Sequence, residues 1–300
     1  MGATFIFTVV ILTAVGLILA VVLFLVAKKF KVEEDPRIDI IEATMPGANC
    51  GGCGFAGCRA FAEACVKSGN LDGKFCPVGG NAVMKKVGEK LGIEVEEKAP
   101  MVAVVRCHGT CDNRPRVNVY DGSSSCKIKA SLFSGDTDCR YGCLGGGDCV
   151  KACKFDAIKL NPKTMLPEVD EDKCTACGAC VKACPKGIIE LRNKGPKNRR
   201  VFVSCMNQEK GAVARKACAV ACIGCHKCEK VCPFGAITVE NNLAYIDFNK
   251  CKLCRKCYDA CPTGAIWAVN FPVKIAKPAP EEAEASPAPK TLLNENKDKE

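Results

Sequence analysis

CIGCHKCEKVCPFGAI, residues 222–237, decides the fold, because four cysteines fall within eleven residues and a proline follows the last of them. The spacing is C-x2-C-x2-C-x3-C-P, which is a ligand run for iron–sulfur clusters. In paired runs of this kind, three thiolates bind one [4Fe–4S] cube and the fourth binds the cube of the partner run. The pattern therefore predicts a second run that shares its clusters with this one.

The second run lies at residues 251–262, and the body of the chain is duplicated. A shift of 79 residues places Cys126, Cys139, Cys143, Cys149 and Cys153 on Cys205, Cys218, Cys222, Cys228 and Cys232. A shift of 77 residues places Cys174, Cys177, Cys180 and Cys184 on Cys251, Cys254, Cys257 and Cys261. The repeat predicts two units like bacterial two-cluster ferredoxins, over residues 99–192 and 193–271.

The crossed arrangement assigns the thiolates of the second unit to two clusters. One takes Cys222, Cys225, Cys228 and Cys261, and the other takes Cys251, Cys254, Cys257 and Cys232. In the first unit, the intact cluster takes Cys174, Cys177, Cys180 and Cys153. The crossed fourth cysteine with its following proline occurs in three of the four runs. This favours iron–sulfur clusters over zinc, which binds four thiolates without such crossing.

The first unit departs from the pattern at its other cluster. Cys143, Cys149 and Cys184 are present, but Gly146 stands where the second unit has Cys225, and Lys154 replaces the proline. Cys139 is the nearest replacement ligand in the sequence, and we expect it to complete the site. The alternatives are a three-iron cluster or a more distant cysteine.

A separate module precedes the repeat, over residues 34–98. Its cysteines Cys50, Cys53, Cys58 and Cys76 have the spacing C-x2-C-x4-C-x17-C and predict one more cluster. Cys65 falls in a helical stretch and is expected to be a small buried apolar residue. The charged segment over residues 81–98 has a helical pattern.

The remaining thiols allow a sixth cluster that bridges the two units. Cys107, Cys111 and Cys126 are close in sequence, and either Cys205 or Cys218 could be the fourth ligand. A rival set uses Cys107, Cys111, Cys126 and Cys139. The sequence does not choose between the two sets. The expected cofactors are therefore about six [4Fe–4S] clusters.

The N-terminus predicts a single membrane-spanning helix. Residues 5–27 carry no charge, and Lys28, Lys29 and Lys31 follow at once. A helix of this length spans a bilayer, and the flanking lysines place the N-terminus outside and the body in the cytoplasm. A cleaved signal peptide would need a basic start, which is missing.

Residues 272–300 are rich in Pro, Ala, Glu and Lys and predict a disordered tail.

Charge and composition exclude several other classes of function. The formal net charge of +10 suggests an anionic partner such as nucleic acid. However, an oxidised cube with its four thiolates carries about −2, so six of them bring the total to roughly −2. Many lysines lie inside the cysteine runs and balance the clusters, so we expect no nucleic-acid role. The chain also lacks a dinucleotide fingerprint and a nucleophile–base pair, so it has no hydride-transfer site of its own.

The expected fold class is α+β, with short strands at residues 101–105 and 201–203, small helices and a core dominated by cofactors. Together, the anchor at residues 1–33, the C-x2-C-x4-C-x17-C module and the tandem units resemble the B subunit of the Rnf electron transport complex. LPEVDEDKCTACGACVKACPKGIIEL and SCMNQEKGAVARKACAVACIGCHKCEKVCPFGAIT are similar to the cluster-rich form of that protein.

The resemblance implies a component of an ion-translocating ferredoxin:NAD oxidoreductase. It would relay electrons between soluble ferredoxin and the flavin-bearing membrane subunits. We expect electrons to enter at the distal ferredoxin-like unit and to leave near Cys50. The alternative is the electron-delivering subunit of a membrane-bound hydrogenase or reductase.

Overall fold

The computed structural model describes residues 2–29, 35–132 and 135–272. Helix α1 (Gly2–Lys29) contains the apolar stretch Phe5–Val26, which has a mean hydropathy of 3.2 and is not buried against the rest of the structure. The hydroxyl of Thr13 donates to the carbonyl of Val9, so this polar group is satisfied inside the helix. The tail that the sequence predicts to be disordered lies outside the described residues, except for residue 272.

Three helices form the module that follows: α2 (Pro36–Thr44), α3 (Cys58–Ser68) and α4 (Gly80–Leu91). Asp35 caps α2 by accepting a hydrogen bond from the backbone N–H of Arg37. The fully buried Phe61 and Ile41 belong to the module's own core. The helix predicted over residues 81–98 ends earlier, at Leu91, because Gly92 adopts a left-handed conformation and its N–H closes the last turn.

Each repeat unit is built from two antiparallel strand pairs. In the first unit, β1 (Met101–Val105) pairs with β4 (Ile189–Asn193), and β2 (Ile158–Leu160) pairs with β3 (Pro167–Val169). In the second unit, β5 (Arg200–Val203) pairs with β8 (Ile266–Val269), and β6 (Ile237–Glu240) pairs with β7 (Leu243–Ile246). The two units thus share one topology, with an outer pair and an inner hairpin. This agrees with the α+β fold that the sequence predicts.

A short helix lies within each of the four cysteine runs. These helices are α6 (Asp148–Lys151) and α7 (Ala179–Ala183) in the first unit, and α9 (Lys227–Lys230) and α10 (Lys256–Ala260) in the second. Each of the four carries one buried cysteine. Two further helices, α5 (Cys126–Leu132) and α8 (Gly211–Ala217), and the 3-10 turn Pro196–Asn198 complete the described elements.

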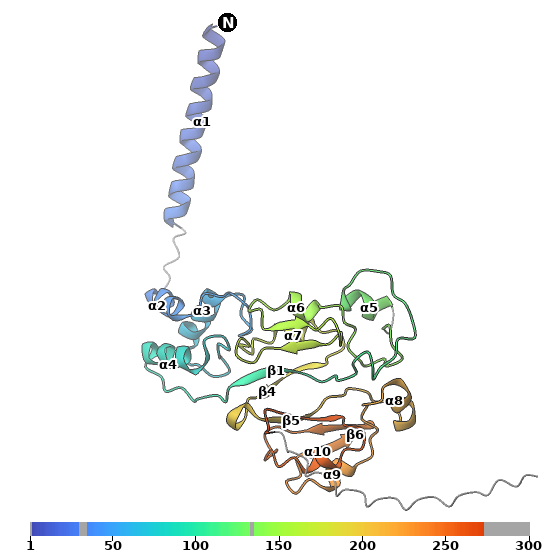
Figure 1. Cartoon of the computed structure of the whole chain (residues 1–300). Coiled ribbons are helices and arrows are strands. Elements are labelled where there is room, and N and C mark those ends of the chain that lie inside the picture. The colour runs from blue at the N-terminus through green and yellow to red at the C-terminus, as the bar shows by residue number, and fades with distance from the viewer. Residues whose placement is uncertain (1, 30–34, 133–134, 273–300) are drawn as a thin grey trace, which may run out of the picture.

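The two units pack through their outer strand pairs, and Figure 1 shows β1 and β4 lying against the sheet that contains β5. Val102 and Val104 contact Phe202 in a small apolar cluster between the units. Two buried arginines cross the interface. Arg106 donates to the carbonyl of Val203, and Arg192 donates to the carbonyl of Ile246.

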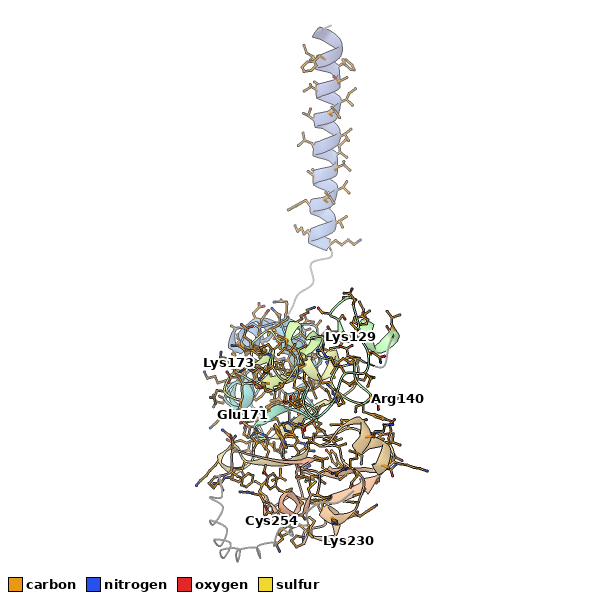
Figure 2. All side chains as sticks on the ribbon, turned by 45° about the vertical axis from the view of Figure 1, so that its right-hand side comes forward. Lys129, Arg140, Glu171, Lys173, Lys230 and Cys254 are labelled. Carbon is orange, nitrogen blue, oxygen red and sulfur yellow. The ribbon has the colours of Figure 1, made fainter. Side chains whose placement is uncertain are left out.

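Cysteines occupy a large share of both cores. The core of the second unit contains the buried Cys205, Cys218, Cys222, Cys228 and Cys257, and that of the first contains Cys149 and Cys180. Two-stranded sheets are only marginally stable by themselves. The units therefore depend on whatever the cysteines bind. Figure 2 shows that Cys254 and Lys230 lie at the far end of the second unit, away from Lys129 and Lys173 of the first.

Candidate metal centres

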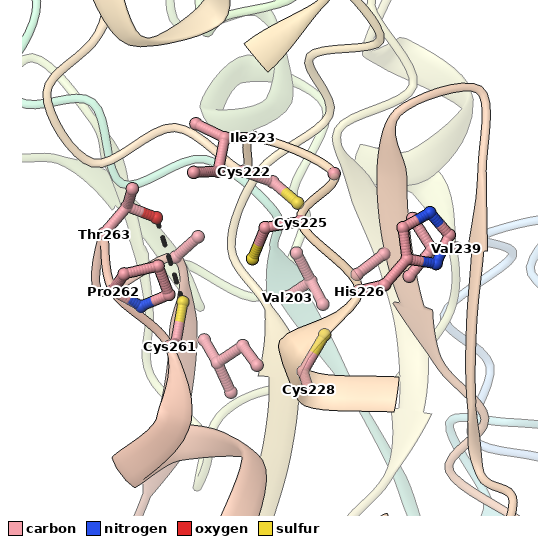
Figure 3. Close-up of a pocket in the computed structure, with 14 residues that line it drawn as sticks. Val203, Cys222, Ile223, Cys225, His226, Cys228, Val239, Cys261, Pro262 and Thr263 are labelled. Carbon is pink, nitrogen blue, oxygen red and sulfur yellow. Dashed lines mark hydrogen bonds between the residues drawn. The ribbon is translucent and has the colours of Figure 1, made fainter. Parts of the chain in front are cut away.

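One pocket in the second unit is lined by Cys222, Cys225, Cys228 and Cys261, among others, and Figure 3 shows the four sulfur atoms around it. His226 and Gly224 have positive φ, and this conformation turns the loop back so that its three thiols face one side. His226 itself is exposed and bonds Glu229, as expected of a spacer in the run. The structure thus brings together the four thiols that the spacing assigns to one cluster.

A second pocket in the same unit is lined by Cys232, Cys251, Cys254 and Cys257. Burial raises the pKa of Cys257 to about 12, and the neighbouring Cys251 and Cys254 thiols add to the rise. The crossing is visible here, because Cys232 belongs to the first run and lies with the three thiols of the second. Ligation by iron stays a prediction at both sites.

In the first unit, Cys174, Cys177 and Cys180 form the equivalent group. Burial raises the pKa of Cys180 to about 12, and the Cys174 and Cys177 thiols add to the rise. Cys153, the predicted crossed ligand, packs against the same core as Cys174 and Cys180. The three thiols of the run are therefore placed as in the second unit.

At the position of Gly146 the structure differs from the expectation that Cys139 completes the site. A Cβ added at Gly146 would lie 2.9 Å from the Sγ of Cys126, so the Cys126 thiol occupies the place where a cysteine at 146 would project. Cys126 lines one pocket with Cys143, Cys149 and Cys184, and Cys139 is not among the residues of that pocket. The physical reason is Asp148, whose carboxylate accepts bonds from the N–H of Lys127 and the hydroxyl of Ser125. These bonds hold the start of α5 against the loop.

The remaining thiols also differ from both sets that the sequence allowed. Cys139 lies near Cys107 and Cys218. Its Sγ accepts a hydrogen bond from the side-chain amide of Asn207, and the backbone N–H of the same Asn207 donates to the Sγ of Cys205. Cys111, a member of both expected sets, is exposed and lies against the carbonyl of Thr164. Because Cys126 is at the Gly146 site and Cys111 lies apart, neither expected set of four is assembled.

In the N-terminal module, Cys76 is part of the buried core, and Cys53 and Cys58 pack against that core. Burial raises the pKa of Cys76, and the Cys53 and Cys58 thiols add to the rise. The N–H of Gly79 donates to the Sγ of Cys76, and the N–H of Gly52 donates to the Sγ of Cys50. Such N–H to sulfur bonds are one of the factors that set cluster potentials.

Cys65 lies apart from these sulfur bonds, within the apolar core of the module. Its side chain is fully buried in α3, and burial raises its pKa to about 11. The thiol therefore stays protonated near neutral pH and packs as a small apolar group.

The module is joined to the first unit at Gly52. A Cβ added there would lie 2.9 Å from both the Cβ and the carbonyl oxygen of Cys177, so only glycine allows this approach. Lys154, the residue that replaces the proline of the run, donates from its Nζ to the carbonyl of Asn49. The loop of the module's first cysteines therefore lies directly on the loop of the first unit's intact run.

The donor sets fit clusters better than single ions. In the described part of the chain, no three His, Cys, Asp or Glu side chains converge as they would on one metal ion. The thiols instead stand around pockets, which suits a cofactor larger than one ion. Burial would keep unligated thiols such as Cys143 and Cys205 protonated, with a pKa of about 12, and a metal displaces that proton.

One buried cation lies among the thiols, and sequence reasoning missed it. Arg114 is 7% exposed, and its Nη2 donates to the carbonyl of Cys143. Its Nε is buried without a hydrogen-bond partner among the described residues, and it lies near the Sγ of Cys218. An N–H so placed fits an acceptor that carries negative charge. The stretch CDNRP around Arg114 gave no sequence signal for this role.

Comparison with known protein families supports the same cofactor. Models of the 4Fe-4S dicluster domain match residues 139–191 and 221–266, a 4Fe-4S double cluster binding domain matches residues 173–235, and an Fe-S cluster model matches residues 45–78. The chain therefore contains several [4Fe–4S] domains. The dicluster model that matches the first repeat unit begins at Cys139.

Three curated relatives match most of the chain. The B subunit of the Na(+)-translocating ferredoxin:NAD(+) oxidoreductase complex of Acetobacterium woodii is 46% identical over 81% of this chain and 71% of its own length. The proton-translocating counterpart of Clostridium ljungdahlii is 42% identical over 83% and 86% of the two chains. The B subunit of the ion-translocating oxidoreductase complex of Methanosarcina acetivorans is 42% identical over 84% and 93%.

The chain belongs to the family of Rnf B subunits. It is thus an electron-transfer iron–sulfur component of an ion-translocating oxidoreductase complex, and other subunits of that complex are its partners. The N-terminal apolar helix fits a single-pass anchor in a membrane-associated complex of the Rnf type. A [4Fe–4S] cluster exchanges one electron at a time, and the thiols in this chain's cysteine runs are the residues that would hold it.

Proposed function

We propose that this chain relays electrons between soluble ferredoxin and the membrane and flavin subunits of an Rnf complex. The observation that carries this proposal is that the two thiol groups of each repeat unit share one buried core. Cys228 of one site in the second unit and Cys257 of the other belong to the same buried core, as do Cys149 and Cys180 in the first unit. Gly52 then joins the first unit to the N-terminal module. Electrons would pass between sites that are neighbours in this packing.

The distal end of the second unit has the features of an entry point. Cys225 and Cys254 are exposed, whereas the thiols of the runs in the first unit are all at least partly buried. The two runs of the second unit and the residue before the second run carry exposed lysines: Lys227, Lys230, Lys250, Lys252 and Lys256. The exposed side chains of Val231, Phe234 and Tyr258 lie on the same runs. Exposed basic side chains on runs that also expose apolar ones suit an acidic redox partner such as ferredoxin.

The opposite end of the relay would be the N-terminal module. Helix α1 ends in Lys28 and Lys29, and its first turn carries no acidic residue. By the positive-inside rule, these lysines place the module and both repeat units on the cytoplasmic side. The module then lies next in the chain to the membrane, where the other subunits of the complex receive or supply electrons.

The test is reduction of the full chain by reduced ferredoxin in stopped-flow absorbance under strict anoxia. Lys230→Glu with Lys252→Glu should lower the second-order rate at least tenfold at low salt, and the difference should shrink as salt screens the charges. Lys163→Glu is the matched control, because Lys163 is equally exposed but lies in the first unit. A wild-type chain that ferredoxin does not reduce, or a control that slows as much as the distal variant, would contradict the proposal.

A further inference from the structure

Four buried or half-buried thiols meet at the junction of the two repeat units. Asn207, which is fully buried, donates its backbone N–H to the Sγ of Cys205 and its side-chain amide to the Sγ of Cys139. The distances are 3.4 and 3.6 Å. One side chain therefore ties a thiol of the first unit to a thiol of the second.

Cys107 and Cys218 complete the group from either side. The loop after β1 carries Cys107, and a Cβ added at Gly109 in this loop would lie 3.2 Å from the Sγ of Cys218. The N–H of Ala219 donates to the carbonyl of Asn113, which fixes Cys218 against the same loop. Burial raises the pKa of Cys218, and the nearby Cys107 and Cys139 thiols add to the rise.

We propose that Cys107, Cys139, Cys205 and Cys218 hold a [4Fe–4S] cluster that bridges the two units. We also propose that Cys126 is the fourth ligand of the site with Cys143, Cys149 and Cys184. Each thiol would release its proton when it binds iron. The inference rests on the proposed function for its role, since it supplies the link between the two halves of the relay.

The bridging site has a neighbour on each side. Cys143 of the first unit lies close to Cys107, and the backbone N–H of Cys222 in the second unit bonds the Sγ of Cys205. The six sites then follow one another in a single order from Cys50 through Cys177, Cys149, the bridging site and Cys222 to Cys254. Without the bridging site, no thiol group lies between the two units in the described part of the chain.

The duplication explains where the bridging ligands come from. Cys126 and Cys205 are equivalent in the repeat. In the first unit Gly146 leaves a gap that Cys126 fills. In the second unit Cys225 fills that gap, so Cys205 is free to turn toward the junction.

The proposal is tested by counting iron and acid-labile sulfide in the full chain purified anaerobically. Six clusters give about 24 irons, and five give about 20. Cys107→Ala and Cys218→Ala, one from each unit, should each lose about four irons, and the double variant should lose no more than either. Cys111→Ala is the matched control and should lose none. Mössbauer spectra should show that the lost irons came from one cluster type.

Several outcomes would overturn the bridging site. A wild-type chain with about 20 irons would overturn the bridging site by itself. This measurement needs no variant, so it is decisive even if the variants fail to fold. A double variant that loses about eight irons shows that the two thiols serve different clusters. The bridging site would also be overturned if the control Cys111→Ala lost as much iron as Cys107→Ala. Because the count does not involve ferredoxin, a full complement of iron in a chain that ferredoxin cannot reduce would reject only the relay.

Discussion

Removal of the positive charge of Arg114 should lower the midpoint potential of the clusters on either side of it. A Cβ placed at Gly109 would lie 3.2 Å from the Sγ of Cys218 and 3.4 Å from the Nε of Arg114. The two atoms are therefore no more than about 6.6 Å apart, the two distances laid end to end. At an effective dielectric constant of about 20, opposite unit charges at that distance attract by about 2.5 kcal/mol.

This energy corresponds to roughly 110 mV for a one-electron couple. The charge of a reduced cluster extends beyond its nearest sulfur, so we expect Arg114→Gln to lower the potential by about 50–100 mV. The sign follows because the reduced cluster is the more negative state, and it loses a neighbouring cation. Arg114→Lys keeps the charge and should shift the potential by less than half as much.

The assay is a dithionite titration of the full chain followed by EPR, with iron analysis of each variant to show that its clusters are intact. The reasoning is refuted if Arg114→Gln retains all its iron and its EPR components titrate at wild-type potentials. A rise in potential would refute it equally, because the sign depends only on the charge of the guanidinium. The same titration of Arg114→Lys separates loss of charge from loss of the hydrogen bond to Cys143.

Three further perturbations test other parts of the structure. Deletion of residues 1–33 should leave a soluble chain that ferredoxin still reduces. In membrane vesicles the truncated chain should no longer support ion pumping, and pumping by it would rule out the anchor's role. Gly52→Ala would bring a Cβ within 2.9 Å of the backbone of Cys177, and it should slow reduction of the N-terminal cluster while the distal unit is reduced at the normal rate. Arg192→Met removes a guanidinium that is 1% exposed and should cost about 3 kcal/mol, or roughly 6–12 °C in the anaerobic melting temperature, whereas the exposed Arg140→Met should not.

The sequence was sufficient for the parts of the site whose ligands are local. The run from Cys222 to Cys228 and the crossed Cys261 form one pocket because the spacing and the following proline fix the loop by themselves. The strand expected at residues 101–105 is β1, since five apolar residues between polar segments favour a buried strand.

The sequence failed where tertiary contacts choose among distant thiols. Cys139 is nearer than Cys126 to the gap at Gly146, yet Asp148 holds the chain so that Cys126 reaches it. Asn207 likewise brings Cys139 and Cys205 together across two units. Separation along the chain says nothing about such contacts, because a few hydrogen bonds between loops decide them.

The junction at Asn207 also has a consequence for the order in which the protein is made. Cys107 and Cys139 leave the ribosome well before Cys205 and Cys218, so the first unit can fold while half of the bridging ligands are still missing. If iron is placed there as proposed, this centre can be filled only after the second unit has docked on the first. Until it is filled, a newly synthesised chain would lack the link that carries electrons from one unit to the other.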